Sequence, residues 1–297
     1  MNEIKFINML SSIHRTSPFG ADGEEWNGMV YTMDSFSPEE DFFKFTPPET
    51  IGHNMAAAVI SDLLACGVKG EFLINSWNIS PALPDEFYAR CAKGIETVLR
   101  HYDMFCIGGD LGSSCASWNW SAVAGGKVPP SGTVRRITSQ KIPFDLYLTG
   151  PVGDANFHAF NHLPMPEIEL RSAVMPETLF ATDTSGGFLD ALENFSRVNP
   201  DLSLHIETIP YANLPELPFP KEFLLIGGVG EYELLFALPQ GIPPQEGIYI
   251  GSGDFSGKGI TFASGGRMKS AALPDYRNTP PEKWLSATEK CYREIFL

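Results

Sequence analysis

The chain has 297 residues, of which 43% are hydrophobic and 19% charged, and its formal net charge is −15. This composition is typical of a globular protein with a packed core, and the length suits two domains of about 150 residues each. The acidic balance excludes a binder of nucleic acid or anionic membrane, because the longest basic run is Arg135-Arg136. The five cysteines form no CxxC pair, no apolar run reaches about 18 residues, and the N-terminus lacks the pattern of a signal peptide. We therefore expect a cytoplasmic protein without a zinc site or a membrane span.

The beginning of the chain contains one helical pattern and one strand pattern. Apolar residues at helical spacing predict a helix over 4–14, and a polar, glycine-containing loop follows at 16–27. Residues 28–33, Gly-Met-Val-Tyr-Thr-Met, predict a strand that ends at Asp34.

The strongest helix signal of the first half begins at Thr46. Thr46 and Glu49 are spaced as a capping box, and Pro47 occupies the first helical position. The helix is expected to continue to about Cys66 and to end at Gly67. Its middle is apolar almost all the way round, which predicts a helix that is buried on every side.

The remaining elements alternate without a regular βαβ rhythm. In the first half we expect a strand at 71–78, a helix at 85–101, a short buried strand at 104–107 and a strand at 118–124. In the second half we expect a strand at 146–149, a short helix, a strand at 179–183, a helix to about residue 197, and strands at 202–207, 222–226, 232–238, 247–250 and 259–263. The polar, proline-containing stretch 127–143 predicts a boundary between domains 1–143 and 144–297. The irregular alternation predicts an α+β, or mixed α/β, fold.

Asp62 is the first residue that indicates a site, because it lies in the middle of the all-apolar helix. A carboxylate in such surroundings must be paired, protonated or bound to a metal, since burying a lone charge is very unfavourable. The alternative is an exposed aspartate at the edge of the helix, paired with a lysine. The apolar neighbours leave little solvent-facing surface, which favours a role as a ligand or a hydrogen-bonding group.

Two further segments combine an acid with small residues. In Gly108-Gly109-Asp110, two glycines after a buried strand allow the backbone to approach a phosphate closely, with a metal ligand beside it. The alternative is an ordinary turn. In the segment 183–187, Asp-Thr-Ser-Gly-Gly, an acid precedes the start of a helix, where anions bind. The alternative is that Asp183 or Ser185 only caps this helix.

Asp22 and Asp34 are weaker indications when each is taken singly, because surface loops are rich in aspartate. Together they favour a magnesium site, since magnesium prefers carboxylate oxygens and an ATP site commonly gathers acids from distant loops. Other nucleotide and hydrolase signatures are absent. The segment 251–259 has the wrong glycine spacing for a P-loop, and no GxGxxG, GxSxG or HExxH motif occurs.

The order and spacing of these segments resemble thiamine-monophosphate kinase. This kinase family is part of the superfamily that includes aminoimidazole ribonucleotide synthetase, selenophosphate synthetase and the hydrogenase-maturation carbamoyl dehydratase. Five short motifs carry the resemblance: Ile51-Gly52 with Ser61-Asp62-Leu-Leu-Ala-Cys-Gly67, Gly108-Gly109-Asp110, Leu148-Thr149-Gly150 with Gly153, Asp183-Thr184-Ser185, and Gly227-Gly228 with Glu231-Tyr232-Glu233-Leu234.

The resemblance implies a two-domain fold, a cofactor set and roles for particular residues. The N-terminal half would form a homodimer through a shared β-barrel, the C-terminal half would be an α/β sandwich, and ATP would lie between the N-terminal halves with Mg²⁺. The residues that resemble metal ligands are Asp22, Thr32, Asp34, Asp62, Asp110 and Asp183, and Asp62 and Asp110 would also be the catalytic acids. The residues that resemble nucleotide contacts are Gly109, Ser185 and, near the position of an ATP-contacting arginine, Arg136. Phosphoryl transfer needs mainly positioning and charge neutralisation, which such acids and Mg²⁺ would supply.

The chain departs from the family pattern at several positions. Ala21 replaces an acid before Asp22, and Gly186 replaces the acid of the "SDG" motif. The motif "GGeD" becomes Gly228-Val229-Gly230-Glu231, and the family's histidine after the first strand is replaced near Asp41. Residues of the nucleotide site are largely kept, whereas residues of the substrate site largely are not.

We therefore expect an ATP- and Mg²⁺-dependent kinase of a small molecule, similar to thiamine-monophosphate kinase but with a changed acceptor site. Two alternatives remain open from the sequence. One is a non-catalytic, nucleotide-binding regulatory relative, and the other is that the aspartates are only helix caps and surface residues.

Overall fold

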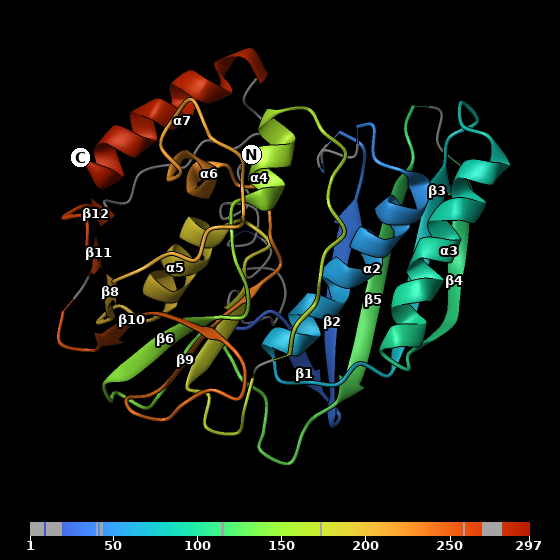
Figure 1. Cartoon of the computed structure of the whole chain (residues 1–297). Coiled ribbons are helices and arrows are strands. Elements are labelled where there is room, and N and C mark those ends of the chain that lie inside the picture. Colours follow the sequence, from blue (N-terminus) through green and yellow to red (C-terminus); the bar gives the residue numbers. More distant parts are fainter. Residues whose placement is uncertain are drawn as a thin grey trace.

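The structure is a computed structural model of the whole chain (Figure 1). It describes residues 9, 20–39, 41, 44–113, 116–172, 174–257, 259–268 and 281–297. The helix expected over 4–14 lies almost wholly outside the described residues. None of the described helices is long and apolar enough to cross a membrane.

Two separate β-sheets with helices packed on them make up the molecule, which confirms the mixed α/β fold (Figure 1). The first sheet has the order β1-β2-β5-β3-β4 and consists of β1 (Glu24–Trp26), β2 (Met29–Phe36), β3 (Phe72–Ile79), β4 (Phe105–Ser113) and β5 (Asn119–Lys127). The second has the order β12-β11-β8-β10-β6-β9-β7 and consists of β6 (Phe144–Leu148), β7 (Phe180–Asp183), β8 (Ser203–Ile206), β9 (Leu234–Pro239), β10 (Ile248–Asp254), β11 (Gly259–Phe262) and β12 (Arg267–Met268). The helices are α2 (Pro48–Ala65), α3 (Asp85–His101), α4 (Asp154–Phe160), α5 (Phe188–Val198), α6 (Phe223–Ile226) and α7 (Pro281–Phe296).

Helix α2 is the central element, because it packs against α3, against β2 and β5 of the first sheet, and against β7 and β9 of the second. Its apolar residues from Met55 to Ile60 are fully buried, as the all-round apolar sequence predicted. The predicted capping box is wrong. Pro47 is the N-cap without a side-chain cap, and the Thr46 hydroxyl instead accepts a hydrogen bond from the backbone N–H of Met165 at 2.8 Å.

Helices α2 and α3 approach each other closely through two glycines. A Cβ atom at Gly52 would lie 1.9 Å from the carbonyl oxygen of Cys91, and one at Gly94 would lie 1.9 Å from that of Glu49. Real side chains cannot occupy these positions unless the two helices move apart. The contact therefore requires glycine on both helices.

Gly52→Ala is accordingly expected to lower the free energy of unfolding by about 2 kcal/mol or more, because overpacking outweighs the better helix propensity of alanine. Chemical denaturation would measure the change. Gly257→Ala is the matched control, because a Cβ atom at Gly257 meets no atom within 4 Å. Equal stability of the two variants would contradict the close helix contact.

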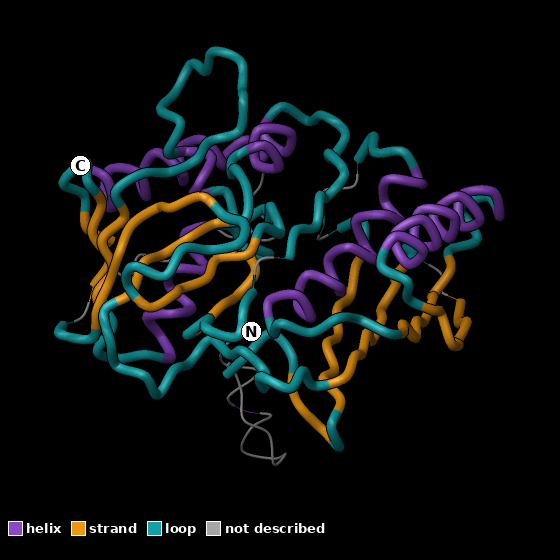
Figure 2. Tube along the Cα trace, turned by 60° about the horizontal axis from the view of Figure 1, so that its bottom comes forward, coloured by secondary structure: helices purple, strands orange, loops and turns teal. Residues whose placement is uncertain are grey.

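One face of the first sheet is covered by α2 and α3, which lie side by side on it (Figures 1 and 2). On β2 the side chains alternate. Val30 and Thr32 are buried toward α2, whereas Tyr31 and Met33 are 36% and 65% exposed on the other face. No described helix covers this other face, which we call the open face of the first sheet. It also carries Phe105, which is 67% exposed and pairs with Phe72.

The segment between α4 and β7 forms hydrogen bonds with α2 and with the end of α3 in the first half of the chain. The Asn54 side chain donates to the carbonyl oxygen of Pro166 at 2.8 Å and accepts from the N–H of Ile168 at 3.0 Å. The hydroxyl of Tyr102 on the loop after α3 donates to the carbonyl oxygen of Leu170 at 3.1 Å. These bonds attach residues 166–170 to α2 and to the end of α3, and β7 packs directly on α2.

Three of the predicted elements are wrong. The strand expected to end at Asp34 continues to Phe36, so Asp34 lies inside β2. The strand expected to be buried over 104–107 is β4, an exposed edge strand that contains the Gly-Gly-Asp segment in its interior. The apolar run predicted as a strand at 222–226 is the short helix α6. Strand β12 and helix α7 were not predicted.

Candidate metal and nucleotide site

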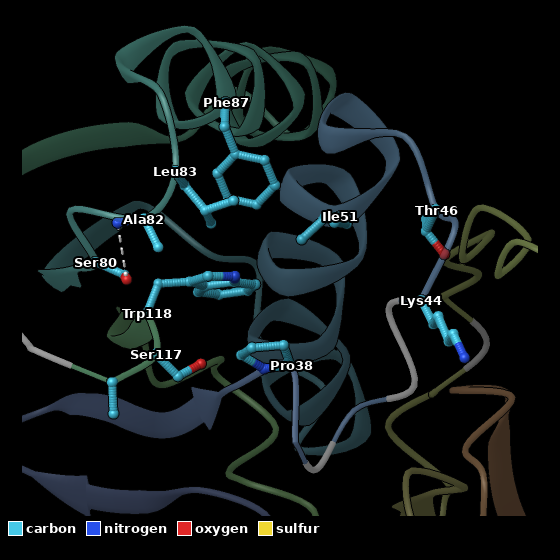
Figure 3. A pocket seen from close by; sticks show the side chains of 11 residues that line it. Pro38, Lys44, Thr46, Ile51, Ser80, Ala82, Leu83, Phe87, Ser117 and Trp118 are labelled. Carbon is cyan, nitrogen blue, oxygen red and sulfur yellow. Dashed lines mark hydrogen bonds between the residues drawn. The ribbon is translucent and has the colours of Figure 1, made fainter.

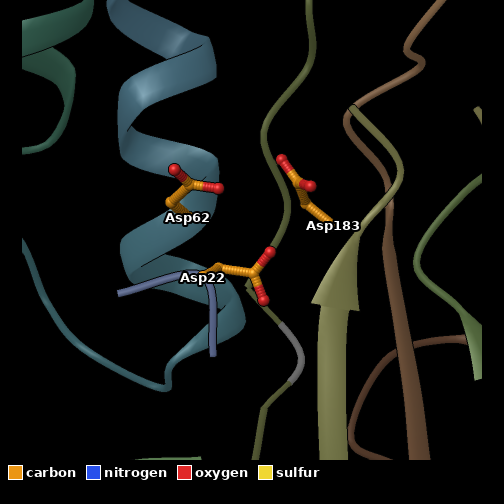
Figure 4. Close-up of side chains that lie close together, drawn as sticks. All are labelled: Asp22, Asp62 and Asp183. Carbon is orange, nitrogen blue, oxygen red and sulfur yellow. The ribbon is translucent and has the colours of Figure 1, made fainter. Parts of the chain in front are cut away.

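Three aspartates from distant parts of the sequence meet between the two sheets (Figure 4). Asp22 comes from the loop before β1, Asp62 from α2, and Asp183 is the last residue of β7. One carboxylate oxygen from each lies within 4.8 Å of those of the other two. The first two belong to the first half of the chain and the third to the second half, so the cluster spans both halves.

Asp62 has the most unfavourable surroundings for a charge. Burial in the apolar helix raises the pKa of its carboxyl group well above its ordinary value, and repulsion from Asp183, Asp22 and Asp34 raises it further. Arg136 opposes the shift only weakly. In the described part of the chain, no hydrogen bond to the Asp62 side chain offsets this cost. A cation bound at the cluster would do so.

Asp22 is paired with Arg136. Its side chain is 1% exposed, forms a salt bridge with the Arg136 guanidinium group, and accepts a hydrogen bond from the Thr182 hydroxyl at 3.0 Å. Arg136 Nε in turn donates to the Thr182 hydroxyl oxygen at 3.0 Å. Burial raises the pKa of Asp22 to about 6, although the arginine lowers it and Asp183 raises it.

Asp183 is held by hydroxyl and backbone donors on both sides. The Ser61 hydroxyl donates to Asp183 Oδ2 at 2.6 Å. The Ser185 hydroxyl and backbone N–H reach Asp183 Oδ1 at 2.7 and 3.2 Å. Ser185, which the sequence predicted as a nucleotide contact, thus orients Asp183 in this structure while its own side chain remains accessible.

Thr32 and Asp34 lie on the face of β2 that points toward α2. The Thr32 hydroxyl is buried and donates to the carbonyl oxygen of Val59 in α2 at 3.0 Å. Asp34 is close enough to Asp62 to raise its pKa. Asp34 therefore adds a fourth negative charge beside the cluster.

Asp110 and Gly109 are not brought to this cluster. Asp110 lies opposite Ser76 on β3, Ser76 opposite Ser121 on β5, and Ser121 opposite Ser35 on β2. Ser35 follows Asp34 in the strand, so Asp110 points to the open face whereas Asp34 points to α2. Within one chain, the two predicted catalytic aspartates therefore lie on different sides of the first sheet.

The donor set of the cluster fits a hard divalent cation such as Mg²⁺. All three groups are carboxylates, a fourth lies nearby, and the guanidinium group of Arg136 forms a salt bridge with Asp22. Mg²⁺ binds oxygen at about 2.0–2.1 Å, so opposite ligands are about 4.2 Å apart, and a spacing of up to 4.8 Å needs only small side-chain rotations. Cys66 lies nearby, and burial raises the pKa of its thiol. A hard cation such as Mg²⁺ prefers oxygen ligands to sulfur.

Sequence reasoning missed three residues that build the site: Ser61, Thr182 and Tyr232. Ser61 belongs to the motif around Asp62, and Thr182 directly precedes the motif around Asp183. Nothing local shows that a hydroxyl points to an acid 122 positions away, as that of Ser61 does. Tyr232 comes from the loop before β9 and faces the same acids, because Asp34, Asp41, Asp183 and Asp62 all raise the pKa of its phenol beyond the effect of burial.

A pocket of about 460 Å³ lies at the other end of α2 (Figure 3). Ile51, Leu83, Phe87 and Trp118 form its apolar wall, and the hydroxyl-bearing residues Thr46, Ser80 and Ser117 also line it. Ile51 and Asp62 are about 16 Å apart along the helix axis at 1.5 Å per residue. The pocket is therefore separate from the aspartate cluster, and no carboxylate lines it.

Comparison with known proteins agrees with the motifs. Residues 21–127 match the family described as AIR synthase related protein, N-terminal domain. The chain is 24% identical over 251 residues to the thiamine-monophosphate kinase of Archaeoglobus fulgidus, which covers 78% of this chain and 79% of the relative. The matched family segment contains Asp22, Asp34, Asp62 and Asp110.

Solved structures share the fold at low sequence identity. The structure of AaThiL complexed with AMPPCP and TMP superposes with a TM-score of 0.74 at 17% identity, covering 91% of this chain and 96% of that one. The HypE-HypF complex contains a chain with a TM-score of 0.71 at 16% identity, covering 91% of this chain and 99% of that one. These findings confirm the resemblance read from the sequence motifs and the two-part fold that it implied.

Proposed function

We propose that this chain, a relative of thiamine-monophosphate kinase with the fold of the AIR synthase superfamily, is an ATP- and Mg²⁺-dependent kinase of a small molecule. The observation that carries the proposal is the convergence of Asp22, Asp62 and Asp183 at one point between the two halves. Burying several carboxylates close together is energetically unfavourable unless a cation binds them. In a chain similar to such a kinase, this arrangement favours a cation site over the alternative that the acids are helix caps or surface residues.

The residues of the site have distinct tasks in this proposal. Asp22, Asp62 and Asp183 would hold Mg²⁺, with Thr32 and Asp34 beside them, and the bound ion would neutralise charge on the transferred phosphoryl group. Ser61 and Ser185 hold Asp183 in one orientation through their hydrogen bonds. Arg136 is paired with Asp22 in this structure and would turn toward a phosphate once a cation takes over that charge.

The second aspartate predicted to be catalytic requires a partner subunit. Asp110 points to the open face of the first sheet, and Gly109 precedes it in the same exposed edge strand. The open face carries exposed apolar side chains of the kind buried between subunits. We propose that two copies pair through this face and that Asp110 and Gly109 serve the nucleotide site of the other copy. The dimerising part would be residues 1–143, with residues 144–297 as the second domain.

Thiamine monophosphate is the first acceptor to test, because the relatives act on it by name. Two positions support an altered acceptor site. A Cβ atom at Gly186 would lie 2.5 Å from Asp190 Oδ2, so the carboxylate of Asp190 occupies the space of a side chain there. The carboxylate of Glu231 accepts the backbone N–H groups of Gly153 and Ala155 at 2.7 and 3.2 Å, so it is committed to the start of α4.

The test is thermal unfolding with Mg²⁺ and ATP, with and without thiamine monophosphate. A ligand at about 100 times its dissociation constant stabilises the native state by about 2.7 kcal/mol, which raises the melting temperature by several degrees. A shift with Mg²⁺ and ATP is expected, and a further shift would identify thiamine monophosphate as acceptor. No shift at saturating Mg²⁺ and ATP would overturn the proposal. Binding of Mg²⁺ and ATP without phosphoryl transfer to any acceptor would favour the alternative of a non-catalytic, nucleotide-binding regulatory protein.

The affinity for Mg²⁺ is expected to fall as the pH is lowered from 7 to 5. A proton competes with the ion for Asp22, whose pKa is about 6, so this residue alone weakens binding about tenfold over that interval. The raised pKa of Asp62 acts in the same direction. Isothermal titration with MgCl₂ at several pH values would measure the effect. A pH-independent dissociation constant would place the ion elsewhere.

A further inference from the structure

Tyr232 lies next to the aspartate cluster but belongs to the loop that leads into β9. Asp183 at the end of β7 pairs with Leu234 at the start of β9, and the two strands are antiparallel. Residues just before Leu234 therefore lie beside the residues that follow Asp183. Gly230 confirms this closeness, because a Cβ atom on it would lie 2.3 Å from the carbonyl oxygen of Ser185.

The two neighbours of Tyr232 are both fastened to the second half of the chain. The carboxylate of Glu231 accepts the N–H groups at the start of α4. The carboxylate of Glu233 accepts a hydrogen bond from the Thr149 hydroxyl at 2.5 Å and forms a salt bridge with Arg171. The chain on either side of the tyrosine is thus held by side-chain hydrogen bonds.

Between these anchors Tyr232 adopts an unfavourable backbone conformation. Its φ angle is +59°, in the left-handed region that bulky side chains rarely occupy. Such a conformation persists only where the surroundings impose it, most often at functional sites. The Tyr232 ring packs against the hydrophobic core that contains α2.

The phenol of Tyr232 lies near several of the acids. Asp34, Asp41, Asp62 and Asp183 act on it electrostatically, yet none of the hydrogen bonds among the described residues involves it. The O–H group of a phenol can donate one hydrogen bond. A ligand that brings an oxygen atom to the cluster would accept that bond.

We propose that Tyr232 is a substrate-contacting residue whose hydroxyl donates a hydrogen bond to a terminal phosphate oxygen of the nucleotide bound at Asp22, Asp62 and Asp183. This inference rests on the proposed function and extends it to a residue of the second half. The cation would draw the terminal phosphate to the point that the aspartates and the tyrosine share. The nucleoside and the inner phosphates would lie beyond reach of the phenol.

The test compares two nucleotides on the wild type and on Tyr232→Phe, which removes only the hydroxyl group. With Mg²⁺ present, the affinity for AMPPCP, which carries a terminal phosphate, is expected to fall about 10- to 100-fold, as on loss of a charge-assisted hydrogen bond. The affinity for ADP is expected to stay within about twofold. Tyr147→Phe is the control, because Tyr147 is a buried tyrosine of β6 that stacks on Phe236.

The outcomes separate this inference from the proposed function. If the wild type binds AMPPCP and Tyr232→Phe binds it equally well, the tyrosine contact is wrong while the nucleotide site stands. If Tyr232→Phe loses AMPPCP and ADP equally, or melts well below the wild type, Tyr232 has a structural role and the inference is overturned. If the wild type binds neither nucleotide, the proposed function itself fails.

Discussion

Asp62→Asn is expected to abolish Mg²⁺-dependent phosphoryl transfer while raising the melting temperature of the metal-free protein. The substitution keeps the shape of the side chain and removes one negative charge from a buried site with at least three others. Loss of the ligand should lower kcat/KM by about 1000-fold or more, because positioning and charge neutralisation supply most of the catalysis. Loss of the repulsion should stabilise the metal-free fold by about 1–3 kcal/mol.

The stability of the metal-free wild type is expected to depend on pH for the same reason. Because the folded-state pKa values of Asp62 and Asp22 are raised, the folded protein binds more protons than the unfolded chain between the ordinary and the raised pKa. The contribution of these two groups to stability therefore decreases as the pH rises from about 4 through 6. Asp62→Asn should flatten this dependence in the metal-free protein.

Differential scanning fluorimetry with EDTA and with MgCl₂, together with a phosphoryl-transfer assay, would measure these effects. Asp103→Asn is the matched control, because the Asp103 side chain is 83% exposed and lies 3.9 Å from Lys69 Nζ in a surface pair. A metal-free Asp62→Asn protein that melts lower than the wild type and retains its activity would show that Asp62 is a structural group.

Phe105→Glu is expected to convert a dimer into a monomer and to remove activity with it. Phe105 lies on the open face of the first sheet with Tyr31, Met33 and Ile74, and it is 67% exposed in the single chain. A charge buried in an apolar interface is left without solvent or partner when the subunits associate. Light scattering after size-exclusion chromatography would measure the mass.

Leu285→Glu on α7 is the control, because it also adds a charge to an exposed apolar position, 52% exposed, in the other half of the chain. A wild type that is monomeric at assay concentration would contradict the proposed pairing. So would a Phe105→Glu variant with the mass of the dimer.

Mixed dimers would decide whether Asp110 acts in the other subunit. Co-expression of Asp62→Asn and Asp110→Asn chains gives dimers that contain one chain of each kind. If each site combines Asp62 of one chain with Asp110 of the other, one site of such a dimer carries both substitutions and the other site carries neither. The mixture should then regain a substantial part of the activity that each variant lacks alone. Inactive mixed dimers would mean that both aspartates act within one chain.

The sequence by itself determined the features that depend on local patterns. The all-round apolar run around Asp62 predicted a buried helix with an acid that needs a partner, and α2 is that helix. The boundaries of α3 are as the apolar stripe predicted, from Asp85 to His101. Burial and periodicity are properties of neighbouring residues, so these predictions did not require knowledge of the rest of the chain.

Only the tertiary structure decided which of the predicted acids meet. Asp22, Asp62 and Asp183 converge where β7 packs on α2, whereas Asp110 points to the open face of the first sheet. A shift of one residue in a strand exchanges its two faces, and the irregular pairing of β3 and β4 between Leu73 and Ile74 makes such a shift. Register of this kind depends on contacts between distant strands, and local sequence patterns do not encode it.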